Sequence, residues 1–214
     1  MQGRSLAIWT FAVTSVALVM VMLDNLVVST ALNVIRQELG ATIEELEWTV
    51  NAYTLTFAVF LLTGAALGDR FGRRRMFIVG VAVFTAASAL AAMSTSVEML
   101  LIGRMAQGMG AAIVAPLTLT LLSAAVPAER RGAALGAWGA VGGVAIAVGP
   151  LVGGAIVEGM AWNWIFWVNV PIGIALIPLA WFGLRESYGP ERQLDVPGLV
   201  PVSYTHLTLP TIQL

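Results

Sequence analysis

Six long apolar stretches dominate this sequence and limit what it can fold into. A helix rises 1.5 Å per residue, so about 20 apolar residues cross a hydrocarbon core ~30 Å thick. Backbone groups in lipid must be bonded within their own segment, and the ten-residue alternation of a membrane barrel is missing. We therefore predict an all-α membrane protein, a bundle of six transmembrane helices. The stretches cover approximately residues 7–33, 48–68, 76–95, 97–124, 133–157 and 164–184.

Composition excludes several other classes of protein. Only 11% of the residues are charged, against roughly 25% in soluble domains. The chain has no cysteine, and its one histidine, His206, lies outside the spans. The motifs H-E-x-x-H and G-x-S-x-G are absent, so a membrane-bound enzyme has no support. A net charge of -1 without a basic patch also speaks against nucleic-acid binding. We expect no enzyme, metal or organic cofactor.

The arginines predict how the bundle is oriented. Nine of the eleven fall on one side of the membrane if the six stretches alternate, and the other side holds mainly glutamates. The positive-inside rule then places the N-terminus in the cytoplasm. We expect a multi-pass protein of the plasma (inner) membrane. The nine are Arg4, Arg70, Arg73, Arg74, Arg75, Arg130, Arg131, Arg185 and Arg192.

The end of the chain departs from the pattern of apolar spans. We expect residues 1–190 to form a six-helix half-domain and residues 191–200 to begin a further span. Residues 201–214 contain two prolines and several hydroxyl side chains, which prevent a spanning helix. We interpret them as a non-native tail on a truncated chain. The alternative is a native, short amphipathic tail.

An arginine lies inside the fourth stretch. Arg104 follows an apolar run, and a charge at the centre of a span costs roughly 2.5–3.5 kcal/mol on insertion scales. It should therefore face the bundle and have a partner, with Gln107 one turn further on the same face. The alternative is that Arg104 extends to the nearby membrane surface.

Asp24 in the first stretch is the partner that we predict for Arg104. It lies at a similar depth in the membrane, eight or nine residues before the end of its span. Burial and a neighbouring arginine act in opposite directions on the protonation of a carboxylate, so its proton can depend on conformation. The pair is thus a candidate for proton coupling. The alternative is a fixed ion pair that holds two helices in register.

A charged motif connects the second and third stretches. Asp69 ends one helix, and a tight turn at Gly72 brings it beside Arg70, Arg73 and Arg74. The arginines also suit anionic lipid at the membrane surface, but that role requires neither the aspartate nor the glycine. We therefore predict a conformational latch here.

The fifth stretch is rich in small residues around a proline. Gly142, Gly149, Gly153 and Gly154 allow close approach of another helix, and Pro150 removes a backbone hydrogen bond and favours a bend. The alternative is ordinary small-residue packing between membrane helices.

The loop motif resembles the signature of the major facilitator superfamily, G-x-L-a-D-r-x-G-r-r. In that family the acid and bases latch the cytoplasmic helix ends in the outward-open state. The sequence departs from the signature at Ala65, where the family usually has glycine, although Gly64 precedes it. The matching residues are Leu67, Asp69, Arg70, Gly72, Arg73 and Arg74.

Further strings resemble the fourteen-helix drug:proton antiporter branch of that superfamily. They are residues 127–136, residues 162–173 and the stretch around Asp24, and Gly149-Pro150-x-x-Gly153-Gly154 is similar to its antiporter motif. The tryptophans of the second string also suit a membrane interface. The chain departs from the branch at Leu26, Ser29 and Asn33.

The resemblance implies a secondary exporter that uses the proton gradient, with Asp24 and Arg104 coupling protons to efflux of a small amphipathic or cationic compound. Its partners would be that compound, protons, lipid and a missing C-terminal half. An importer of a small metabolite, or a membrane sensor with the same fold, stays possible. Candidate cavity residues are Asn25, Gln107, Trp48 and Tyr53. The alternative for Trp48 and Tyr53 is that they face lipid or the apolar core.

Overall fold

The computed structural model describes residues 3–189 of the chain, and this part is helical without strands. Six of its helical segments have the length and composition to cross a membrane. The predicted fold class, an all-α membrane protein with six spans, is confirmed. The expected next span at 191–200, the tail at 201–214, Arg192 and His206 lie outside the described residues. The helices are α1 (Gly3–Leu39), α2 (Ile43–Phe71), α3 (Arg73–Ala92), α4 (Val97–Ala125), α5 (Ala128–Gly159), α6 (Trp164–Trp167) and α7 (Asn169–Gly183).

Several helices extend beyond the apolar stretches, and at the start of α2 a polar cap accounts for the extension. The Thr42 side chain accepts a hydrogen bond from the Glu45 amide, and the Glu45 carboxylate accepts one from the Thr42 amide. This capping box satisfies amide groups that a helix start leaves without partners. Hydropathy alone therefore underestimates the length of α2.

The sixth span is interrupted near its start. It consists of α6 and α7, which are separated by Val168. Asn169 is the first residue of α7, and its side chain is buried. The interruption therefore lies where a polar side chain enters the bundle.

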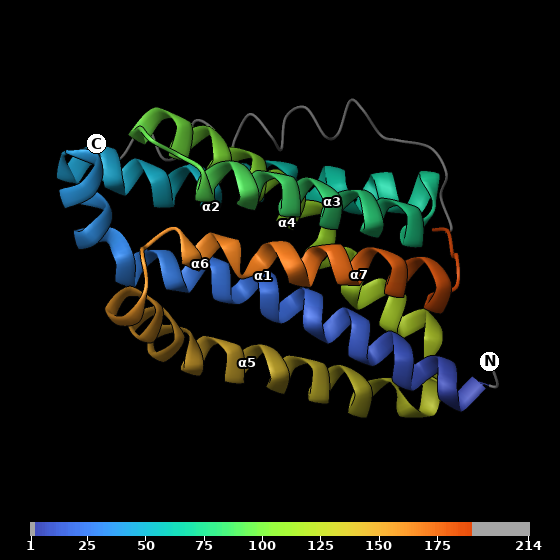
Figure 1. Cartoon of the computed structure of the whole chain (residues 1–214). Coiled ribbons are helices and arrows are strands. Elements are labelled where there is room, and N and C mark those ends of the chain that lie inside the picture. The colour runs from blue at the N-terminus through green and yellow to red at the C-terminus, as the bar shows by residue number, and fades with distance from the viewer. Residues whose placement is uncertain (1–2, 190–214) are drawn as a thin grey trace, which may run out of the picture.

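The helices are arranged around α1 and α4 (Figure 1). Helices α2 and α3 both pack along α4, α7 lies against α3 and α1, and α5 packs mainly on α1 at the edge of the bundle. Where α2 meets α4, a Cβ added to Gly64 would lie 2.5 Å from the Ala112 carbonyl oxygen. Gly64 thus permits the close helix contact even though the family's usual glycine is replaced by Ala65.

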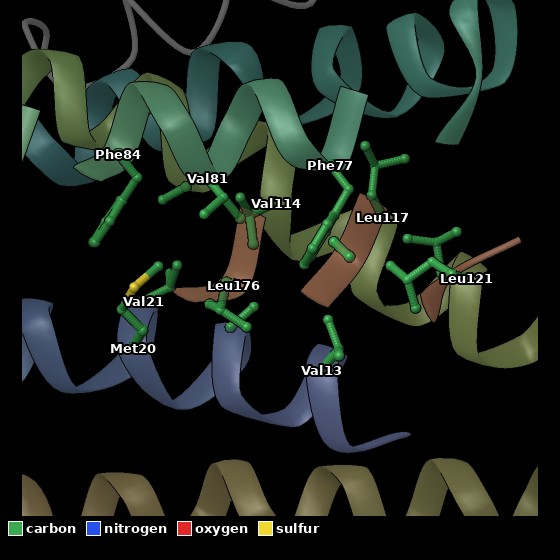
Figure 2. Packing of buried hydrophobic residues seen from close by; sticks show 14 of the residues in the cluster. Val13, Met20, Val21, Phe77, Val81, Phe84, Val114, Leu117, Leu121 and Leu176 are labelled. Atoms are coloured by element: carbon green, nitrogen blue, oxygen red, sulfur yellow. The ribbon is translucent and has the colours of Figure 1, made fainter. Parts of the chain in front are cut away.

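The buried apolar residues form two clusters along the bundle. Figure 2 shows the first, in which Met20 of α1, Phe84 of α3 and Leu176 of α7 pack together. The second contains Val28 of α1 and Phe166 of α6. Asp24 lies between Met20 and Val28 on the same face of α1, since the three are spaced four residues apart. A polar layer therefore separates two apolar clusters.

Candidate functional site

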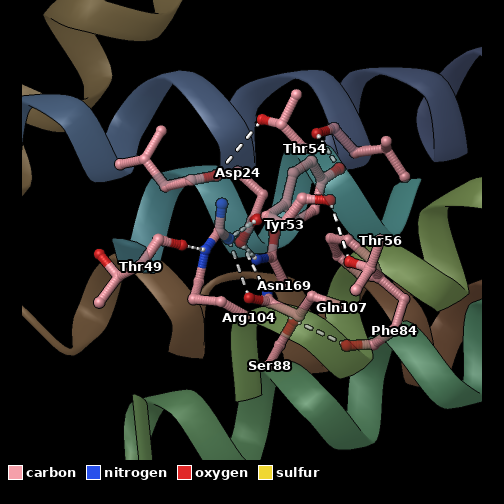
Figure 3. Close-up of polar contacts among 12 residues, drawn as sticks. Asp24, Thr49, Tyr53, Thr54, Thr56, Phe84, Ser88, Arg104, Gln107 and Asn169 are labelled. Carbon is pink, nitrogen blue, oxygen red and sulfur yellow. Dashed lines mark hydrogen bonds and ion pairs between the residues drawn. The ribbon is translucent and has the colours of Figure 1, made fainter. Parts of the chain in front are cut away.

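Asp24 and Arg104 form an ion pair in this layer (Figure 3). The Nη1 atom of Arg104 lies 2.5 Å from Oδ2 of Asp24, and neither side chain is exposed. The predicted contact between α1 and α4 is confirmed. The alternative that Arg104 extends to the membrane surface is wrong, because its guanidinium is enclosed by the bundle.

Two amides also donate to the Asp24 carboxylate. Its Oδ1 accepts from Nε2 of Gln107 at 2.9 Å and from Nδ2 of Asn169 at 2.7 Å. Gln107 also accepts from Arg104 Nη1 at 2.9 Å and donates to Ser88 Oγ at 2.8 Å. Helices α1, α3, α4 and α7 are therefore joined by one hydrogen-bonded network around a single carboxylate.

Aromatic rings enclose the Arg104 guanidinium. Its Cζ lies 4.3 Å from the ring centre of Tyr53 and 5.8 Å from that of Phe166. Its Nε donates to the Thr49 carbonyl oxygen at 3.4 Å. The negative face of an aromatic ring attracts a cation, and this attraction is larger where water is excluded. These contacts offset part of the cost of burying the arginine, and they bring α2 and α6 into the site.

The predicted cavity residues divide into two groups. Gln107 and Tyr53 join the Asp24–Arg104 network directly. Trp48 is 50% exposed, Asn25 is half-buried, and neither belongs to the network as the described residues form it. A role in a substrate cavity stays a prediction for all four.

The charged motif lies at the opposite end of α2 from its capping box. Gly72 is the only residue between α2 and α3, and its φ of 107° lies in the region that favours glycine. The Asp69 carboxylate accepts from Arg73 Nε at 2.8 Å, one turn along the chain. The Arg70 guanidinium lies 5.2 Å from the ring centre of Phe71.

The segment after α7 is tied to this turn. Glu186 Oε1 accepts from the Arg74 amide at 2.8 Å, and Oε2 lies 3.6 Å from Arg74 Nε and 3.7 Å from Arg75 Nε. A Cβ added to Gly72 would lie 2.8 Å from the carboxyl carbon of Glu186. The Gly189 amide also donates to a backbone carbonyl of α2, at 3.1 Å. Gly72 is therefore needed for its backbone conformation and for this contact.

Three glycines of α5 face α1. A Cβ added to Gly142, Gly149 or Gly153 would lie within 3.2 Å of an α1 side chain, whereas one added to Gly154 would have no neighbour within 4 Å among the described residues. Pro150 is exposed, and α5 continues through it. The close packing of α5 on α1 thus uses three of the four glycines, and the bending role of Pro150 stays a prediction.

Sequence reasoning did not select Asn169, Ser88 or Glu186 as site residues. Asn169 is a polar residue in an apolar run, the same signal that identified Asp24 and Arg104. Ser88 gave no such signal, because a serine in a membrane helix can bond to its own backbone, as Ser88 does to Phe84. Glu186 lies after the last span, where a charged residue gives no signal of a specific role.

A bundle of membrane helices with an acid, an arginine and two amides paired at its centre is characteristic of membrane transport proteins, in which charges within the membrane belong to substrate or ion pathways. Comparison with known families agrees with this class. The sequence model of the family described as Major Facilitator Superfamily matches residues 14–207, and the chain belongs to that family. Its members are transporters, so the prediction that the chain is not an enzyme is confirmed.

Relatives named for resistance and export are among the similar proteins. The Tetracenomycin C resistance and export protein of Streptomyces glaucescens is 36% identical over 91% of this chain and 36% of its own length. The Methylenomycin A resistance protein of Bacillus subtilis is 39% identical over 91% of this chain and 42% of its own. An uncharacterized MFS-type transporter of Mycobacterium tuberculosis is 44% identical over 81% of this chain and 30% of its own. The chain thus spans about a third of the length of these relatives.

A solved structure has the same fold. The crystal structure of a bacterial homologue of the human lysosomal transporter Spinster, in an inward-facing and unoccupied conformation, matches with a TM-score of 0.65. The match covers 90% of this chain and 46% of that one at 15% identity. At this identity the likeness concerns the fold alone.

Proposed function

We propose that this chain is one half of a secondary active exporter, in which protons that enter down their gradient drive the efflux of a small amphipathic or cationic compound. The observation that carries the proposal is the fully buried Asp24–Arg104 pair, bonded to Gln107 and Asn169. Relatives named for antibiotic resistance and export support the direction of transport and the class of substrate.

Protonation of Asp24 changes the charge of the layer. With the carboxylate ionised, the pair is neutral and both charges are bonded. A proton on Asp24 leaves Arg104 as a buried cation without its counter-ion, which is costly in a low-dielectric interior. Arg104 then keeps neutral acceptors, the Gln107 side chain and the Thr49 carbonyl. The conformation drawn in Figure 3 suits the deprotonated carboxylate, and proton binding favours a rearrangement of α1 against α4.

The charged turn at Gly72 is the proposed latch that responds to this rearrangement. Asp69 holds Arg73, while Arg74 and Arg75 share Glu186. In the complete carrier, these charges lie at the cytoplasmic surface of the inner membrane, beside the second half. The two halves together enclose a substrate cavity near the midplane, where transporter repeats meet.

Reconstitution of the full-length protein in vesicles tests the proposal. An imposed pH gradient should drive a dye of the amphipathic cation class across the vesicle membrane, against the direction in which protons flow. Addition of that dye to one side should likewise move protons toward that side. Proton movement in the same direction as the dye identifies an importer. No movement of any dye in a panel identifies a non-transporting sensor, and either result refutes the proposal.

A further inference from the structure

The connection between α5 and the sixth span is fastened to the end of α1. The indole Nε1 of Trp162 donates to the Glu38 carboxylate at 2.9 Å, although the two residues are 124 positions apart. Trp162 is 3% exposed, whereas Glu38 lies at the surface. A buried indole N–H usually has a hydrogen-bond partner, and a charged acceptor makes the bond stronger. This contact therefore joins two segments at the end of the bundle where α1 ends.

Trp162 continues this connection into the bundle. Its ring meets the Phe166 ring edge-on, with ring centres 6.2 Å apart and an angle of 89° between the ring planes. Its carbonyl oxygen accepts from the Ile165 amide at 3.0 Å. Rings in this arrangement attract one another beyond the effect of the area that they bury. Trp162 thus holds the first turn of the sixth span through both its ring and its backbone.

The same part of the sixth span contacts both members of the buried ion pair. Phe166 has no exposed surface, and its ring centre lies 5.8 Å from Cζ of Arg104. Asn169, three residues further along, donates to Oδ1 of Asp24 at 2.7 Å. Any shift of this segment therefore moves a neighbour of the cation together with a donor to the anion.

We infer that Trp162 is a positioning residue of the proposed exporter, which links the Glu38 contact to the state of the buried ion pair. While the indole is bonded to Glu38, the turn stays in place and Phe166 keeps its ring against the Arg104 guanidinium. When Arg104 leaves the carboxylate, the turn loses this attraction, and the bond between Trp162 and Glu38 weakens as a result. Coupling of this kind acts equally in both directions. The inference rests on the proposed function, and it gives the string at 162–173 a role besides its place at the membrane interface.

Fluorine NMR of the full-length protein, with fluorotryptophan in place of tryptophan, tests the link without any transport. The Trp162 signal is identified by its loss in Trp162→Phe. We expect Asp24→Asn, which removes the charge of one member of the pair, to shift the Trp162 signal. The Trp164 signal is the control in the same spectrum, because Trp164 is only two residues away but is 49% exposed. Arg104→Lys, which keeps the charge but loses the planar group, should give the same shift if Asp24→Asn fails to fold.

Glu38→Ala tests the link in the opposite direction. With the acceptor removed, the maximal rate of dye efflux per folded protein should fall about two- to tenfold, which is the population ratio that one aromatic pair supports. The KM for the dye should stay unchanged. Glu38→Gln should restore most of the rate, because its amide oxygen still accepts from the indole. Glu47→Ala removes a carboxylate from an exposed position at the same end of the bundle and should leave the rate unchanged.

Unchanged efflux in Glu38→Ala would show that the bond only anchors the connection, and would overturn the inference. A loss that Glu38→Gln repeats in full would do the same, because the charge and not the hydrogen bond would then be responsible. A protein that pumps while its Trp162 signal ignores both changes in the ion pair refutes the inference alone. One whose Trp162 signal follows the pair but that moves no dye refutes the proposed function alone.

Discussion

Arg104 of α4 lies 2.5 Å from Asp24 of α1, although the two are 80 positions apart in the sequence, and neither side chain has exposed surface. Opposite charges enclosed in this way stabilise one another only while both are present.

Asp24→Asn should abolish proton-driven efflux while the protein still inserts in the membrane. The amide keeps the shape of the side chain but cannot exchange a proton. Transport against a gradient, measured with a fluorescent dye in vesicles, should fall to the level of empty vesicles. Ser29→Ala is a suitable control, because Ser29 is exposed and its hydroxyl donates to the Leu26 carbonyl of its own helix. If the Asp24→Asn variant still pumps against the gradient, the proton is carried elsewhere.

Arg104→Ala should destabilise the protein by about 3–5 kcal/mol, because it leaves the Asp24 carboxylate buried without a counter-ion. Thermal unfolding of the purified protein in detergent measures this loss. The double variant Asp24→Asn with Arg104→Ala should recover part of it, since no unpaired charge is then buried. If the loss in the double variant equals the sum of the losses in Asp24→Asn and in Arg104→Ala, the two charges are not coupled.

Gly72→Ala should lower stability by about 1–3 kcal/mol, since alanine is strained at a positive φ. The new methyl group would also meet the Glu186 carboxylate, 2.8 Å away. Gly132→Ala is the matched control, because Gly132 lies inside α5 and a Cβ there has no neighbour within 4 Å among the described residues. The control should unfold at the same temperature as the natural protein or slightly above it. An identical response of the two variants in thermal unfolding would contradict this account of the turn.

Glu186→Gln should loosen the segment after α7 by weakening its contacts with Arg74 and Arg75. Hydrogen exchange should become faster at the Arg74 amide, which donates to Glu186, and at the Gly189 amide, which donates to the Asp69 carbonyl. Exchange in the middle of α7 should stay unchanged. Glu158→Gln, at an exposed position near the end of α5, should leave all of these amides unaffected. Unchanged exchange at Arg74 in the Glu186→Gln variant would mean that the carboxylate does not hold the segment.

The sequence predicts the six spans and the contact of Asp24 with Arg104 because the apolar membrane interior requires a recognisable sequence pattern for each. A span needs an unbroken apolar run, and a charge within one needs a partner. Gln107 follows from helical periodicity. Asn169 and Ser88 do not, because their roles depend on how α7 and α3 turn toward α1, and periodicity within one helix does not determine this. Glu186 joins the charged turn through an irregular segment, for which sequence patterns give no register.

The attachment of Glu186 and Gly189 to the turn between α2 and α3 has a mechanical consequence. When the segment after a helix makes no contacts, a pull on that segment acts directly on the end of the helix. Here a pull on the chain beyond Gly189 acts first on the hydrogen bonds at the α2–α3 turn, and only after they break on α7. Tension from whatever follows in the polypeptide is therefore delivered to the arginines of the turn, while the Asn169 end of α7 stays unloaded.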